Sequence, residues 1–286
     1  MPQIAYLNGR YVPRAQARVR AEDRGYLFGD GVYEVIPVHA GKLVAADRHF
    51  QRLGRSLGEL RIAWPMKRAA LEVVAREVIA RNGIQQGAVY IQVTRGVAPR
   101  DHKFPKDGVP PGLFVTAKRT KPMPAALLRD GAAVITVPDQ RWGRCDIKSL
   151  NLLPNVLAKQ AAAEQGAHEA WLVDTDGNVT EGSSTSAWIV TAEGVLATRP
   201  NGTEILPGVT RAIVVDVVRE LGLKLELRPF SLEEAHKARE AFITSTNNYV
   251  LPITRIDGKP VGDGKPGPTA QHLRAAYLKA TDRVPA

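Results

Sequence analysis

The sequence is poor in cysteine and in aromatic side chains. It has one cysteine, Cys145, and aromatic residues make up 6% of the 286 positions. A single cysteine excludes an intramolecular disulfide and suits a reducing compartment. The six histidines and this cysteine show no CxxC or HExxH spacing, which argues against a structural zinc site. We therefore expect no bound metal.

Long apolar runs are also missing. No run approaches the roughly 20 residues that a membrane span needs, and residues 1–16 lack the apolar centre of a signal peptide. Hydrophobic residues make up 44% and charged residues 24%, as in ordinary globular proteins. We expect a cytoplasmic protein of one large or two ordinary domains, with no membrane partner.

Acidic residues are scarce in the first half of the chain. Residues 1–121 hold 21 basic and 10 acidic residues, whereas residues 122–286 hold 18 and 19. Such an excess is typical of a nucleic-acid surface, a membrane patch or a site for small anions. A nucleic-acid module would need an aromatic binding motif or a sustained basic helix, and neither is present. We expect no nucleic-acid partner, with most of the excess on solvated surface.

The first part of the chain, 1–119, predicts an α+β domain. The turn pairs Asn8-Gly9 and Ala40-Gly41 separate strand-like segments. Two helical patterns follow, the first with Asp47 as its N-cap. The expected strands are 4–7, 10–12, 32–39, 42–44, 88–94 and 113–117, and the second helix is 67–81.

A linker is expected at 120–124, because two prolines in three residues favour an extended connector. The remaining residues, 125–286, predict an α/β-type domain. Its strands are expected at 132–137, 170–173, 178–181, 187–190, 195–198 and 241–245, the middle four as a meander. Its helices are expected at 151–165, 210–221 and 269–281, with a capping box opening a short helix at Ser231.

Lys148 is the first candidate for chemistry. It lies between a strand and a helix, where Ile147 and Leu150 can partly bury it. Burial disfavours the ammonium form and produces a nucleophilic amine, which can form a Schiff base. A solvated loop lysine is the alternative, and lysine is usually exposed.

Two features of the second half could serve a cofactor. Glu181 ends a strand and could hold a pyridine nitrogen protonated, although a simple turn carboxylate fits as well. The N–H groups of Val209 and Thr210 open a helix after Gly208, an arrangement that binds phosphate. An ordinary helix entry with Thr210 as a cap is the alternative.

Cationic side chains of the first half could bind anions. Arg52, on the face opposite a helical apolar stripe or at the margin of that stripe, could reach a phosphate, although helix-surface arginines are usually solvated. Arg100 and His102 lie on a loop bounded by prolines and could clamp a carboxylate, for which arginine offers a two-pronged fork.

Together these blocks resemble the fold-type IV pyridoxal 5′-phosphate transaminases, and within them the bacterial D-amino acid aminotransferases. The resemblance covers most of the chain and implies a two-domain, fold-type IV PLP-enzyme architecture of α+β and α/β domains. Six ordered blocks at matching spacing carry it: Arg24-Gly-Tyr-Leu-Phe-Gly-Asp-Gly-Val-Tyr-Glu34, Val93-Thr-Arg-Gly96, Arg100-x-His102, Cys145-Asp-Ile-Lys-Ser-Leu-Asn151, Thr180-Glu-Gly-Ser183 and Gly208-Val-Thr-Arg211.

The resemblance implies a role for each matching residue. Lys148 would be the catalytic residue, holding pyridoxal 5′-phosphate through a Schiff base and then shuttling a proton. Glu181 would pair with the ring nitrogen, and Leu206 would pack against the ring. The phosphate would be bound by Arg52, Val209, Thr210 and Thr246, and the substrate α-carboxylate by Tyr33, Arg100 and His102.

The implied reaction moves the amino group of a D-amino acid such as D-alanine to a 2-oxo acid such as 2-oxoglutarate, with ping-pong kinetics. In this family the Arg-x-His loop reaches the site of the other subunit, so a homodimer is implied. The alternatives are a branched-chain L-amino acid transaminase, an (R)-amine transaminase and aminodeoxychorismate lyase. Ser186, where asparagine is common, and Asn247 depart from the family pattern and leave the substrate range open.

Overall fold

The computed structural model describes residues 3–106 and 108–282, and the chain divides into two compact units. The first runs to Lys121 and includes the later segment Ile147–Asn151, and the second is formed by Pro122–Asp146 and the chain from Leu152 onward. The predicted division into 1–119, a linker at 120–124 and 125–286 did not foresee that the segment Ile147–Asn151 returns to the first unit. Backbone pairing explains the difference, because Lys148 and Leu150 hydrogen-bond to the strand that begins at Gly31.

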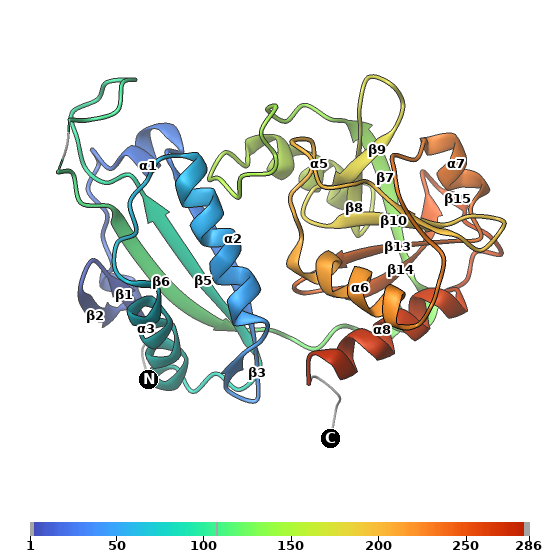
Figure 1. Ribbon diagram of the computed structural model, residues 1–286, viewed down its shortest axis with the longest axis horizontal. Helices are drawn as coiled ribbons and strands as arrows, with labels where there is room; N and C mark the ends of the chain where they lie inside the picture. The colour runs from blue at the N-terminus through green and yellow to red at the C-terminus, as the bar shows by residue number, and fades with distance from the viewer. Residues whose placement is uncertain (1–2, 107, 283–286) are drawn as a thin grey trace. The chain divides into compact units, whose positions relative to one another are not determined.

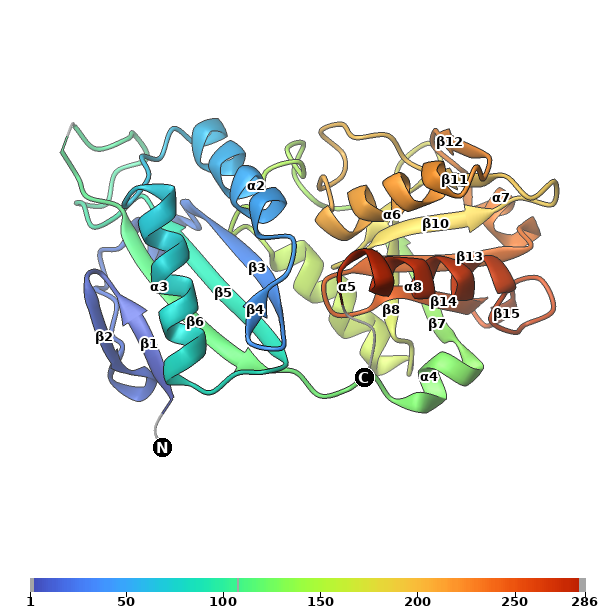
Figure 2. The same cartoon turned by 60° about the horizontal axis from the view of Figure 1, so that its bottom comes forward.

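An antiparallel sheet of six strands forms the centre of the first unit, in the order β2-β1-β6-β5-β3-β4 (Figure 1; β4 is labelled in Figure 2). The hairpin predicted at Asn8-Gly9 is confirmed, since both residues have positive φ and Leu7 pairs with Arg10. The strands are β1 Ile4–Leu7, β2 Arg10–Pro13, β3 Gly31–His39, β4 Lys42–Leu43, β5 Gly87–Thr94 and β6 Gly112–Arg119.

Two long helices cover this sheet (Figure 2). Helix α2 packs on β3, and helix α3 packs on β1 and β6. The apolar stripe Phe50, Leu53 and Leu57 is buried, as its spacing predicts. Asp47 is not the N-cap of α2, because Ala45 caps the helix and Asp47 lies in its first turn, ion-paired to Arg68. The helices are η1 Arg14–Gln16, α1 Arg24–Phe28, α2 Ala46–Glu59 and α3 Arg68–Arg81.

A mixed sheet of nine strands forms the second unit, in the order β12-β11-β10-β13-β14-β7-β8-β9, with β15 paired to β14. The predicted meander is wrong, because β9 pairs with β8 whereas β10 pairs with β11 and β13. The strands are β7 Ala132–Pro138, β8 Glu169–Val173, β9 Val179–Gly182, β10 Ser186–Val190, β11 Leu196–Thr198, β12 Leu225–Leu227, β13 Glu240–Ser245, β14 Tyr249–Ile256 and β15 Lys259–Pro260.

Five helices of the described chain belong to the second unit. Helices α6 and α8 lie side by side against β13 and β14 (Figure 2), and α5 packs on β7 and β8 with its own small core. Within the described ranges, no helix combines the length and the apolar character needed to cross a bilayer. The helices are α4 Ala125–Asp130, α5 Leu153–Glu164, α6 Val209–Glu220, α7 Leu232–Lys237 and α8 Pro268–Ala280.

Candidate active site

Lys148 is held by the first unit through its backbone. Its N–H donates to Ser56 Oγ (3.2 Å) on α2, and its carbonyl accepts from the Tyr33 N–H (3.0 Å) on β3. The neighbouring Ile147 is buried in the core of this unit. The side chain is half-buried, with Nζ 4.2 Å from the centroid of the Tyr33 ring. The amine of Lys148 is therefore fixed against an aromatic face rather than free in a solvated loop.

The Tyr33 ring in turn stacks on Tyr90 of the neighbouring strand, with the centroids 5.7 Å apart. The Tyr90 hydroxyl donates to Gln92 Oε1 (2.7 Å). Burial raises the pKa of Tyr90 to about 12, so its phenol stays protonated. Two tyrosines thus line the strand surface beside Lys148.

Arg52 is buried on α2, one turn before Ser56. Its guanidinium forks onto the buried Glu34, with Nε 3.0 Å from Oε2 and Nη2 2.5 Å from Oε1, and His49 Nδ1 lies 2.9 Å from Oε1. Burial alone would raise the pKa of Glu34, but the charge of Arg52 and hydrogen bonds from His49 and Arg52 lower it well below its usual range. Burial lowers the pKa of His49 despite its contact with Glu34. Arg52 is therefore an oriented cation rather than a solvated one.

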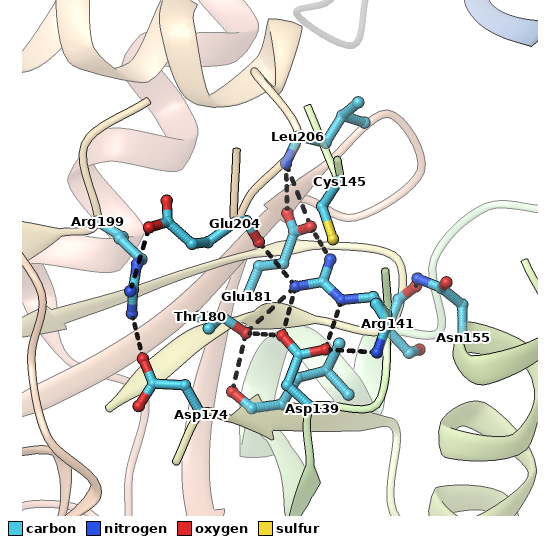
Figure 3. Close-up of polar contacts among 12 residues, drawn as sticks. Asp139, Arg141, Cys145, Asn155, Asp174, Thr180, Glu181, Arg199, Glu204 and Leu206 are labelled. Carbon is cyan, nitrogen blue, oxygen red and sulfur yellow. Dashed lines mark hydrogen bonds and ion pairs between the residues drawn. The ribbon is translucent and has the colours of Figure 1, made fainter. Parts of the chain in front are cut away.

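Glu181 is buried on β9 of the second unit and faces a guanidinium (Figure 3). Arg141 Nη1 donates to Glu181 Oε1, while Arg141 Nη2 and Nε donate to Asp139 at 2.7 and 2.9 Å. Arg141 also donates to Thr180 Oγ1 (3.3 Å) and to the Glu204 carbonyl (2.9 Å). One arginine thus pairs with two carboxylates, the buried Glu181 and the half-buried Asp139.

The charge state of this cluster follows from its pairing. Burial alone would raise the pKa of Asp139, but hydrogen bonds from Arg141 lower it, and Arg141 keeps its charge although burial opposes it. With Glu181 ionised, Asp139, Arg141 and Glu181 together carry one net negative charge. Such a group favours a cationic or proton-donating partner.

Leu206 connects Glu181 to the start of α6. Its N–H donates to both carboxylate oxygens of Glu181, at 3.2 and 3.3 Å (Figure 3). The side chain of Leu206 is half-buried. The loop that leads into α6 is therefore anchored on Glu181.

Helix α6 begins at Val209 after Gly208, which caps it without a side-chain hydrogen bond. The first N–H groups of an α-helix have no acceptor within the helix, so they attract anions. A Cβ on Gly208 would lie 2.9 Å from Ser186 Oγ and 3.3 Å from Arg211 Cβ, so glycine is needed for this close approach. Thr210 is buried in the first turn.

Arg211, next in the helix, adds a buried cation. It donates to Asn201 Oδ1 (2.9 Å) and to the Arg199 carbonyl (2.5 Å), and burial lowers its pKa to about 10. Thr246 lies half-buried in the turn between β13 and β14. Because Ser186 pairs with Thr244 across β10 and β13, this turn lies at the same end of the sheet as Gly208.

Arg100 and His102 are exposed on the loop between β5 and β6. Both contact Phe28, with the Arg100 guanidinium carbon 5.3 Å from its ring centroid and the two ring centroids of Phe28 and His102 5.5 Å apart. The loop therefore presents both side chains outward from a defined base.

The sequence reasoning missed two residues of this arrangement. Glu34, which orients Arg52, stands in the Arg24–Glu34 block, but no role was assigned to it. Arg141, which pairs with Glu181, stands seven positions before Lys148 with no local pattern to mark it. Its partner is 40 residues away in sequence, so only tertiary structure identifies the contact.

Solved aminotransferases share this fold over nearly their full length. The branched-chain amino acid aminotransferase of T.th., with pyridoxamine 5′-phosphate, is 28% identical with a TM-score of 0.88, covering 100% of this chain and 96% of that one. The branched-chain enzyme of Escherichia coli is 23% identical with a TM-score of 0.87, covering 100% and 96%. The fold is that of an aminotransferase.

Sequence comparison narrows the class. Residues 31–256 match the family described as Amino-transferase class IV. The D-alanine aminotransferase of Staphylococcus haemolyticus is 40% identical over 274 residues, 96% of each chain, and that of Bacillus licheniformis is 43% identical over 269 residues, 94% of each chain. The chain belongs to the class IV aminotransferase family.

Proposed function

We propose that the protein is a pyridoxal 5′-phosphate-dependent D-amino acid transaminase, moving the amino group of a D-amino acid such as D-alanine to a 2-oxo acid such as 2-oxoglutarate. The observation that carries the proposal is the Lys148 amine, held half-buried 4.2 Å from the Tyr33 ring centroid. The D-alanine aminotransferases that match nearly the whole chain support the substrate class.

The described residues suit pyridoxal 5′-phosphate. The cofactor, when bound, supplies an aldehyde for the lysine and a ring that accepts electrons. Its phosphate is a dianion, for which the start of α6 at Val209 and Thr210 offers N–H donors. Arg52, oriented by Glu34, and Thr246 complete the proposed phosphate ligands.

Lys148 is the proposed catalytic residue. Its backbone is fixed at the N–H by Ser56 and at the carbonyl by Tyr33, so the reach of its amine is limited to a small volume. With its amine free, Lys148 Nζ would take the proton from the substrate Cα and deliver it to the cofactor carbon that receives the amino group, which requires a free amine in a fixed place.

Glu181 is the proposed partner of the cofactor's ring nitrogen. A protonated ring nitrogen is a cation, and the Asp139–Arg141–Glu181 cluster has one net negative charge to offer it. Arg141 keeps Glu181 an acceptor, because a carboxylate paired with a guanidinium resists protonation. The Leu206 N–H fixes the carboxylate from the other side, and the Leu206 side chain is proposed to pack on the ring.

Tyr33, Arg100 and His102 are the proposed ligands of the substrate carboxylate. Arginine grips a carboxylate with two parallel hydrogen bonds, and exposure of Arg100 and His102 suits a loop that serves a neighbouring subunit. The handedness of the substrate would follow from the side on which its carboxylate is held.

A homodimer is part of this proposal. Helix α5 exposes three apolar side chains at helical spacing, namely Leu153, Val156 and Leu157, which are 69%, 57% and 58% exposed. An exposed apolar stripe of this kind is characteristic of an association surface. A cytoplasmic location is proposed as well, supported by the single cysteine.

The test measures the half-reactions of the purified holoenzyme with D-alanine, L-leucine and (R)-1-phenylethylamine. We expect rapid conversion with D-alanine followed by regeneration with 2-oxoglutarate. Lys148→Ala is expected to abolish both turnover and the visible absorbance of the bound cofactor, and Lys237→Ala, at an exposed position on α7, serves as control. Unchanged D-alanine turnover in Lys148→Ala would refute the proposal. Activity confined to L-leucine or to the amine would replace it with the corresponding alternative.

A further inference from the structure

We propose that Arg24, Asp30 and Arg95 form a buried network that positions the Arg100–His102 loop for the substrate carboxylate. This inference rests on the proposed function, which uses Arg100 and His102 as carboxylate ligands. The three residues belong to sequence blocks that the transaminase resemblance highlights, but that resemblance gives them no role. All of the contacts that follow lie within the first unit.

Asp30 is the centre of the network. It accepts from Arg24 Nε at 2.8 Å and from Arg95 Nε and Nη2 at 2.7 and 2.9 Å. The side chains of Arg24, Asp30 and Arg95 are only 3%, 10% and 9% exposed. Two guanidinium groups are thus held by one carboxylate away from solvent, so their directions are fixed.

Arg24 reaches from this centre into the loop itself. Its Nη1 donates to the Asp101 carbonyl at 2.5 Å, and Asp101 stands between Arg100 and His102. The Arg24 backbone N–H also donates to the Gly96 carbonyl (2.9 Å) at the base of the loop. One residue therefore bonds the loop at its base and at the peptide between the two proposed ligands.

Phe28, at the end of the same short helix, supports the two ligand side chains. Its ring centroid lies 4.8 Å from the guanidinium carbon of Arg24 and 5.3 Å from that of Arg100. The His102 ring is 5.5 Å from it, centroid to centroid. The Phe28 ring thus lies between the fixed Arg24 and the exposed Arg100 and His102, and its contacts restrict the rotamers of the two exposed side chains.

Arg95 anchors the other side of the loop. It donates to the carbonyls of Leu60 (2.8 Å) and Arg61 (3.1 Å), just beyond the last turn of α2, where a cation is favoured. Its guanidinium carbon also lies 3.6 Å from the centroid of the Phe104 ring, two residues after His102. The loop is therefore held on both sides of the Arg100–His102 pair.

The charge of the network suits an anionic substrate. Burial alone would raise the pKa of Asp30, but hydrogen bonds from Arg95 and Arg24 lower it, so the carboxylate stays ionised. Two guanidinium groups and one carboxylate leave a net charge of +1 behind the loop. A carboxylate that approaches Arg100 is attracted by this charge as well.

The test compares Arg24→Met and Phe28→Leu with Arg100→Met, using Arg20→Met as a control at an exposed arginine of the preceding segment. The half-reaction of each holoenzyme with D-alanine gives an apparent dissociation constant and a limiting rate. We expect the dissociation constant to rise about tenfold or more in Arg24→Met and about threefold in Phe28→Leu, as for lost orientation of a charged hydrogen bond. The limiting rate, the cofactor absorbance and the control should change little.

A double variant that combines Arg24→Met with Arg100→Met separates positioning from a general structural effect. If Arg24 acts through Arg100, Arg24→Met should add much less in the Arg100→Met background than it does alone. Two results would overturn the network but not the proposed transaminase. One is full additivity of the effects of Arg24→Met and Arg100→Met on the dissociation constant. The other is a D-alanine affinity that Arg100→Met weakens but that neither Arg24→Met nor Phe28→Leu changes. If Arg24→Met fails to fold, Phe28→Leu decides. A wild-type enzyme that is inactive on D-alanine, or indifferent to Arg100→Met, would overturn the proposed function and this inference with it.

Discussion

The two units use the same ion-pair chemistry in opposite proportions. In the first unit one carboxylate, Asp30, is shared by two arginines, which leaves an excess positive charge. In the second unit one arginine, Arg141, is shared by two carboxylates, which leaves an excess negative charge. The first arrangement suits the carboxylate of a substrate, and the second suits a protonated ring nitrogen.

The two clusters account for little of the charge difference between the halves of the chain. The first 121 residues carry a net charge of +11 and the rest carry −1, but most of the charged side chains are exposed or half-buried. The two clusters differ instead in the sign of a local charge, which is set by how many partners each central residue has. Three predictions test whether these local imbalances have the effects that we assign to them.

The largest expected effect comes from removing the shared cation of the second unit. Arg141→Met leaves the buried Glu181 and the half-buried Asp139 without their guanidinium, so one of them takes up a proton. We expect transamination to slow by about 100-fold or more and the free energy of unfolding to fall by about 3–5 kcal/mol. Steady-state kinetics and urea unfolding measure the two changes.

Arg144→Met is the matched control, since Arg144 pairs with Asp146 at a partly exposed position. The activity of Arg141→Met should also recover partly at higher pH, where the remaining carboxylates ionise. A variant with wild-type rate and an unchanged pH profile would show that Arg141 does not hold Glu181 ionised.

A smaller effect is expected from Glu34→Gln, which removes the negative charge from the Glu34–Arg52 pair in the first unit. The pKa of Glu34 is lowered on folding from a usual value of 4.5, so the unfolded chain binds more protons as acid is added. The stability supplied by Glu34 is therefore present above that value and lost as the pH falls below it. Glu34→Gln should unfold more readily at pH 7 and show a flatter loss of stability on acidification.

Urea unfolding between pH 3 and 7 measures this dependence. We also expect the cofactor to bind about tenfold more weakly, because Arg52 loses the carboxylate that orients it. Glu59→Gln, on the same helix as Arg52 and 35% exposed, is the control. If wild type and Glu34→Gln lost stability identically on acidification, Glu34 would not be the source of this pH dependence.

The smallest effect concerns Cys145, close to the Arg141 cluster. Burial raises the pKa of its thiol to about 11, with Arg141 opposing and Glu181 adding to the rise. At pH 8 its alkylation by iodoacetamide should be about 100-fold slower than that of an exposed cysteine. Arg141→Met should slow it further, measured by mass spectrometry. Rapid labelling of the native protein would show that the thiol is not shielded as the structure implies.

Much of the fold could be predicted from local patterns. The hairpins at Asn8-Gly9 and Ala40-Gly41 follow from turn chemistry, and helices α3 and α6 begin and end within one residue of the predicted bounds. Helix α1 was missed because five residues are too few to show a period; it depends on the Asp23 cap and the left-handed Gly29. Strands β9 and β10 look consecutive, but they pair with different neighbours.

The sequence by itself determined the local elements and was sufficient to single out the proposed reactive groups, such as Lys148, Glu181 and Arg100. Hydrophobic period, turn residues and helix caps act between near neighbours, so a single chain reveals them. Only the tertiary structure decided how many partners each charge has. Arg95 lies 65 residues from Asp30, and Arg141 lies 40 residues from Glu181. Because burial strengthens such pairs and makes an unpaired charge costly, these distant contacts set the sign of the charge that each unit offers to a ligand.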